Sequence, residues 1–106
     1  MKKEQLTQQS QASRQRRLNH YTNSGHGALA MARLADDIRR AQFIGVSTAA
    51  DTELLHRYLT GFQRLVDQRD TMPTRQWLAE CNDVRELAHD IVSRLISGKI
   101  ELRGVI

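Results

Sequence analysis

The sequence predicts an all-α protein: a small bundle of three to four helices with a flexible basic N-terminal arm and a short β-like C-terminal tail. Apolar side chains recur every three or four positions from Met31 to Ile96, the spacing of one helix face. Glycines and the single proline separate these runs, apart from Gly61. A chain of 106 residues suits one domain with a modest core.

The first 25 residues are predicted to form the arm, and residues 26–106 the single helical domain. Residues 1–20 hold five Lys or Arg against one acidic side chain, so they carry the whole net charge of +4. This segment has few apolar side chains, and their burial cannot offset the entropy lost on ordering. We therefore expect the arm to be disordered alone or to become helical on binding.

Two helices are predicted in the first half of the domain. The first runs from Ala28 to Phe43, where Gly45 is expected to end it as a C-terminal glycine. The second spans 49–69 and begins with Thr48 and Asp51, three residues apart, a pattern that resembles a capping box. Gly61 falls on the apolar face of this second helix and predicts a close crossing with another helix.

The stretch from Pro73 to Ser97 is predicted to be helical, because proline suits a first helical turn and Gly98 a helix end. It forms either one helix or two, since Asp83 and Glu86 make a second capping-box pattern at Asn82–Asp83. The two-helix alternative would allow a DNA-binding helix-turn-helix between residues 74 and 95. Exposed acidic side chains there would repel phosphate, which disfavours that motif.

The tail, residues 99–106, alternates apolar Ile100 and Leu102 with charged Glu101 and Arg103, which is the period of a strand. A lone strand is not stable. The tail is therefore expected to pair with its own copy in a dimer, to join the sheet edge of a partner, or to lie over the helices.

The predicted core combines the apolar faces of the three helices, and these faces exceed what one small monomer buries neatly. A homodimer is therefore predicted. The predicted core positions are Leu34, Ile38, Leu54, Leu55, Tyr58, Leu59, Phe62, Leu65, Trp77, Leu78, Leu87, Ile91, Val92 and Leu95.

Catalytic and metal chemistry is not predicted, and no cofactor or metal site is expected. One cysteine and four histidines are scattered without the short spacings of zinc sites. Cys81 and His89 lie two helical turns apart, about 12 Å at 1.5 Å per residue, so they do not form a nucleophile–base pair. Asp36 and Asp37 are expected on a solvated helix face, with Asp36 paired to Arg40.

The cell compartment is predicted to be the cytoplasm. The single cysteine allows no disulfide within the chain, which is typical of a reducing compartment. No apolar run approaches the roughly 20 residues of a membrane span, so no membrane partner is expected.

Two functions are predicted, neither of them enzymatic. In the first, the chain is a nucleic-acid-associated regulatory protein whose basic side chains neutralise phosphates. In the second, it is a phage- or plasmid-style inhibitor or adaptor that docks on a host nucleic-acid enzyme. The candidate nucleic-acid- or partner-binding residues are Lys2, Lys3, Arg14, Arg16, Arg17, Arg39 and Arg40.

Overall fold

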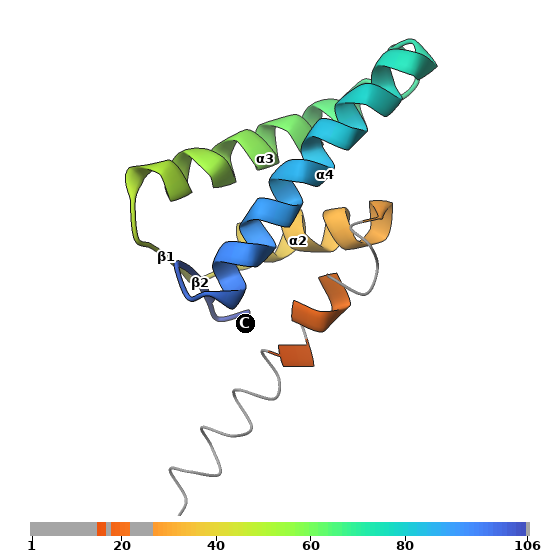
Figure 1. The fold of residues 1–106 in the computed structure, drawn as a ribbon. Coiled ribbons are helices and arrows are strands. Elements are labelled where there is room, and N and C mark those ends of the chain that lie inside the picture. The colour runs from red at the N-terminus through yellow and green to blue at the C-terminus, as the bar shows by residue number, and fades with distance from the viewer. Residues whose placement is uncertain (1–14, 17, 22–26, 106) are drawn as a thin grey trace, which may run out of the picture.

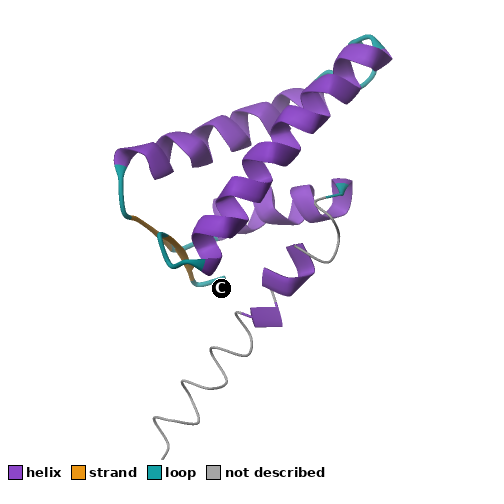
Figure 2. Ribbon diagram, viewed as in Figure 1, coloured by secondary structure: helices purple, strands orange, loops and turns teal. Residues whose placement is uncertain are grey.

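A computed structural model describes residues 15–16, 18–21 and 27–105 of the chain (Figure 1). The first described residues, 15–16 and 18–21, are helical. The elements that follow are α2 (Ala28–Arg40), β1 (Phe43–Val46), α3 (Ala49–Asp67), α4 (Thr74–Ile96) and β2 (Ile100–Arg103). The described part is mostly helical, as predicted. It departs from a strict all-α class because β1 and β2 form a two-stranded antiparallel sheet (Figure 2).

The centre of the fold is an antiparallel hairpin of α3 and α4, and α2 packs against both helices (Figure 1). The capping box predicted at the start of α3 is confirmed, because Thr48 and Asp51 exchange side-chain and backbone hydrogen bonds. Residues 73–97 were predicted to form either one helix or two. The structure shows one continuous helix of 23 residues, α4. A turn at Asn82–Asp83 is absent, so the helix-turn-helix alternative is wrong. Gly98 follows α4 with a φ of +80°, a conformation that glycine adopts readily.

At Gly61, α3 lies close to α4. A Cβ placed on Gly61 would lie 3.0 Å from Cγ2 of Val84 on α4, tighter than ordinary van der Waals contact. The close helix crossing predicted at Gly61 is therefore present.

The C-terminal tail pairs with β1 of its own chain, a partner that was not predicted. Its buried Ile100 and Leu102 pack against the helical core, which agrees with the alternative that the tail lies over the helices. Phe43 lies opposite Arg103 and Val46 opposite Ile100 in an antiparallel register. The prediction that the first helix extends to Phe43 is wrong, because α2 ends at Arg40 and Gly45 lies within β1. The β-branched Ile44 and Val46 favour extended backbone, and pairing satisfies the backbone groups of the tail.

The core contains most of the predicted positions, with one clear correction. Leu78 is 53% exposed, so its assignment to the core is wrong. Leu59, Phe62, Trp77 and Leu87 are only partly buried and pack against the core. Conversely, Leu18 and Tyr21, which composition assigned to the arm, are buried in the core cluster.

Two tyrosines bind buried polar groups of α2. The Tyr21 hydroxyl donates to Oδ2 of Asp37, and the Tyr58 hydroxyl donates to the carbonyl oxygen of Met31. Asp37 is 1% exposed, so its expected place on a solvated face is wrong. Burial raises the pKa of Tyr58, which keeps this hydroxyl protonated as a donor.

Candidate functional site

An apolar groove of about 420 Å³ opens near the loop end of the α3–α4 hairpin. We call it the hairpin groove. The side chains come from the start of α2, the end of α3 with its following loop, and the first half of α4. The lining residues are Ala28, Met31, Phe62, Leu65, Val66, Arg69, Trp77, Leu78, Cys81 and Arg85.

The three helices that line this groove differ in length. At about 1.5 Å per residue, α2 is about 20 Å long, α3 about 29 Å and α4 about 35 Å. The loop end of the hairpin therefore extends beyond α2, as Figure 1 shows. From α2, Ala28 and Met31 near its start line the groove.

Specific contacts hold the walls of the groove in place. The indole Nε1–H of Trp77 donates to the carbonyl oxygen of Leu65 at 3.1 Å, which ties the start of α4 to the end of α3. The Phe62 ring stacks on Tyr58 with 6.3 Å between ring centroids. Nearby, Arg64 Nε lies 2.7 Å from Oε1 of Glu80 and joins the same two helices. These contacts link the ends of α3 and α4 that form two walls of the groove.

Two large apolar side chains are exposed at the groove. Val66 on α3 is 55% exposed, and Leu78 on α4 is 53% exposed. Single exposed apolar side chains are common, whereas here two of them border one apolar depression.

The charged groups that line the groove are both arginines, Arg69 and Arg85. Arg85 Nη1 also donates to Oδ1 of Asn82 at 2.8 Å, within α4. No Asp or Glu is found among the described residues that line the groove. The border of this apolar surface is therefore cationic.

Cys81 lies in the groove as a buried thiol. Burial raises the pKa of Cys81, and the positive charge of Arg85 opposes this effect only in part. The protonated thiol is a small apolar group and a poor nucleophile. His89 is exposed further along the same helix, as the predicted spacing requires.

The sequence-predicted binding residues are only partly within the described structure. Arg16 is exposed in the first helical segment. Arg39 donates to Oε1 of Gln63 on α3 at 3.2 Å. Arg40 lies 3.5 Å from Asp36 in an exposed pair, as predicted. The remaining candidates lie outside the described residues: Lys2, Lys3, Arg14 and Arg17. Of the described candidates, Arg16, Arg39 and Arg40 do not line the hairpin groove.

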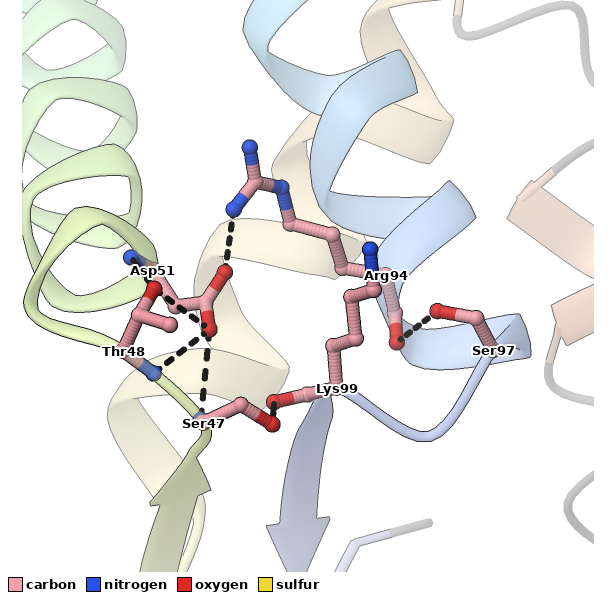
Figure 3. A network of polar contacts seen from close by, with 6 residues as sticks. All are labelled: Ser47, Thr48, Asp51, Arg94, Ser97 and Lys99. Carbon is pink, nitrogen blue, oxygen red and sulfur yellow. Dashed lines mark hydrogen bonds and ion pairs between the residues drawn. The ribbon is translucent and has the colours of Figure 1, made fainter.

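A separate polar network joins α3, α4 and the sheet (Figure 3). Asp51, 1% exposed, accepts hydrogen bonds from the backbone N–H groups of Ser47 and Thr48 and from the Arg94 guanidinium. The Ser47 hydroxyl donates to the carbonyl oxygen of Lys99 at 3.0 Å. The hydrogen bond from Arg94 lowers the pKa of Asp51, with help from Thr48 and against the opposing effect of burial. Every member of this network is engaged within the fold, which indicates a structural role.

Replacing Asp51 by Asn is expected to reduce the loss of stability in acid. The pKa of Asp51 in the folded state lies below its ordinary value of 3.8, so the unfolded chain takes up this proton first as the pH falls. The stabilising contribution of the carboxylate is therefore complete above that ordinary value and is lost as the pH falls through the folded-state pKa. Urea midpoints at about pH 6 and about pH 3 would measure the change.

The prediction is tested by the change in urea midpoint between about pH 6 and about pH 3, measured separately for each variant. Arg94→Gln removes the largest cause of the lowered pKa, so it is also expected to show a smaller acid-induced loss than the wild type. An equal loss in the wild type and in Asp51→Asn would contradict the role assigned to this carboxylate.

No protein-family model matches the chain, and no curated protein or solved structure matches it. None of the helices in residues 27–105 and the short described stretch before them is both long and apolar enough to cross a bilayer. In the same part of the chain, no three His, Cys, Asp or Glu side chains are grouped as a metal site.

Sequence reasoning did not find the hairpin groove, although one signal pointed towards it. The sequence predicted apolar faces larger than one monomer would bury, and Val66 and Leu78 are exposed apolar side chains of those helices. The sequence alone did not indicate where along the helices the uncovered part would lie, because that depends on the length and position of α2.

Proposed function

We propose that the chain is a non-enzymatic protein-binding module that docks a partner protein in the hairpin groove. The observation that carries the proposal is the exposure of Val66 and Leu78 beside a pre-formed apolar depression. Burial of apolar area is worth roughly 25 cal/mol per Å², so covering these side chains would favour association. This corresponds to the adaptor or inhibitor class expected from the sequence, acting in the cytoplasm.

The chemistry of the groove favours a protein over a nucleic acid as its occupant. Nucleic-acid interfaces are polar and strongly cationic, and they contact many phosphates. The hairpin groove holds two arginines among mainly apolar side chains. Protein interfaces, by contrast, have a core of apolar and aromatic side chains with a polar rim. The groove has this composition, with Trp77 and Phe62 in its walls.

Nucleic-acid association is the second candidate function, and the charge of residues 1–20 favours it. The net charge of +4 resides there, and Arg16, Arg39 and Arg40 are exposed in the described part. A regulator of this kind would bind through cations outside the groove. A homodimer also remains a prediction.

Leu78→Glu is expected to abolish capture of the groove partner while leaving the fold intact. The full-length tagged chain is used in a pull-down from the native host cell, with and without nuclease, and bound proteins are quantified by mass spectrometry. Leu78 is exposed, so a charged side chain there disrupts docking without entering the core. Ile96→Glu is the matched control, because Ile96 is 56% exposed on the same helix but does not line the groove.

The proposal predicts a partner protein whose capture survives nuclease treatment. The wild type and Ile96→Glu capture this protein, and Leu78→Glu does not. Capture that survives in Leu78→Glu, or that disappears after nuclease treatment, would reject the groove as the docking site. Loss after nuclease treatment would support the nucleic-acid candidate instead.

A further inference from the structure

We infer that the occupant of the hairpin groove is an amphipathic helix with acidic residues beside its apolar face. This inference rests on the proposed function and specifies the chemistry of the partner. Two features of the groove carry it: its mainly helical walls, which offer no sheet edge, and the two arginines that line it.

The walls of the groove favour a helical partner over an extended one. Most lining residues belong to the helices α2, α3 and α4, whose interior backbone N–H and C=O groups bond within each helix. An extended peptide laid in the groove would find no sheet edge to pair with, and burying its unpaired backbone is costly. A helix satisfies its own backbone and presents apolar side chains at i, i+3, i+4 and i+7.

The charges of the groove favour acidic residues beside that apolar face. Arg69 lies in the loop after α3 and Arg85 lies on α4, and both contribute to the lining. The guanidinium group forms paired hydrogen bonds with a carboxylate. Carboxylates at the edge of a docked helix would therefore be attracted, and lysines at the same positions would be repelled.

The same charges disfavour the two occupants that this chain could itself supply. Residues 1–14 include Lys2, Lys3 and Arg14 against Glu4, so this segment carries the same sign of charge as the border. The groove of a second copy presents the same two arginines and, among the residues that the structure describes, no acidic lining side chain. Pairing two grooves face to face would bring like charges together.

An unbiased selection tests the inference. A display library of helical peptides with random surface positions and no tryptophan is selected against the folded full-length chain. Enriched peptides are then synthesised and titrated against the protein. Trp77 is the only tryptophan and lines the groove, so its fluorescence reports binding there directly. We expect the enriched sequences to combine the helical apolar spacing with an excess of Asp and Glu.

Variants of the protein separate the apolar contribution from the charge. Leu78→Glu is expected to weaken the selected peptides at least about thirtyfold, the size of a hot-spot loss, while Ile96→Glu has little effect. Arg69→Glu is expected to weaken acidic peptides about five- to tenfold, and more at low salt than at high salt. Arg57→Glu is the matched control, because Arg57 is an exposed arginine of α3 that does not line the groove.

The outcomes separate failure of this inference from failure of the proposed function. Enriched peptides that need Leu78 but are neutral or basic would overturn the acidic partner and leave the protein-binding groove standing. A selection that yields no peptide dependent on Leu78 would overturn both. A dimer of the wild type that Leu78→Glu dissociates, measured by analytical ultracentrifugation, would make a second copy the occupant and overturn the inference.

Discussion

Replacing Tyr21 by Ala is expected to lower the free energy of unfolding by about 3–5 kcal/mol, as for other buried aromatic side chains. Tyr21 is fully buried, and its hydroxyl donates to the buried carboxylate of Asp37. The substitution leaves a cavity and also removes a hydrogen bond from a buried acidic group. A domain of this size has only about 5–15 kcal/mol in total, so the variant would be close to unfolding at room temperature.

Urea denaturation followed by circular dichroism measures this loss. Tyr21→Phe keeps the ring and removes only the hydroxyl, so it is expected to cost about 1–3 kcal/mol. Asn19→Ala changes an exposed residue of the same helical segment and is expected to change stability by less than about 0.5 kcal/mol. If Tyr21→Ala were as stable as Asn19→Ala, residues 18–21 would not be part of the core.

Replacing Gly61 by Leu is expected to cost about 1–3 kcal/mol, because the new side chain must enter the contact between α3 and α4. Even a single Cβ at this position would lie 3.0 Å from Cγ2 of Val84. Gly61→Ala is expected to be nearly neutral. Its gain in helix propensity of up to about 1 kcal/mol is opposed by this close contact.

Thermal and urea unfolding test the crossing by comparing Gly61→Leu with three further variants. Thr60→Leu introduces the same side chain at the adjacent exposed position and is expected to change stability by less than about 0.5 kcal/mol. Val84→Ala makes room, so the double variant with Gly61→Leu is expected to lose less than the sum of the two single losses. Equal stability of Gly61→Leu and Thr60→Leu would show that the helices do not touch at this point.

Features that depend on neighbouring residues followed from the sequence. The capping box of Thr48 and Asp51 was predictable because its hydrogen bonds join residues three apart. The helical spacing correctly indicated α3 and α4, and it placed Gly61 on the face where α4 crosses. The strand period of the tail was also correct, because alternation of Ile100 and Leu102 with charged residues is local.

Features that depend on distant partners were decided only in the tertiary structure. The tail found its partner in residues 43–46, more than fifty positions earlier in the chain. Tyr21 is a core residue that packs in the apolar cluster, and Asp37 of α2 accepts a hydrogen bond from its buried hydroxyl. Apolar spacing identifies the helix face that is buried against other elements. It does not indicate which element packs on that face or how long this element is. Only the tertiary structure shows that Leu78 is exposed and that α2, α3 and α4 together line the hairpin groove.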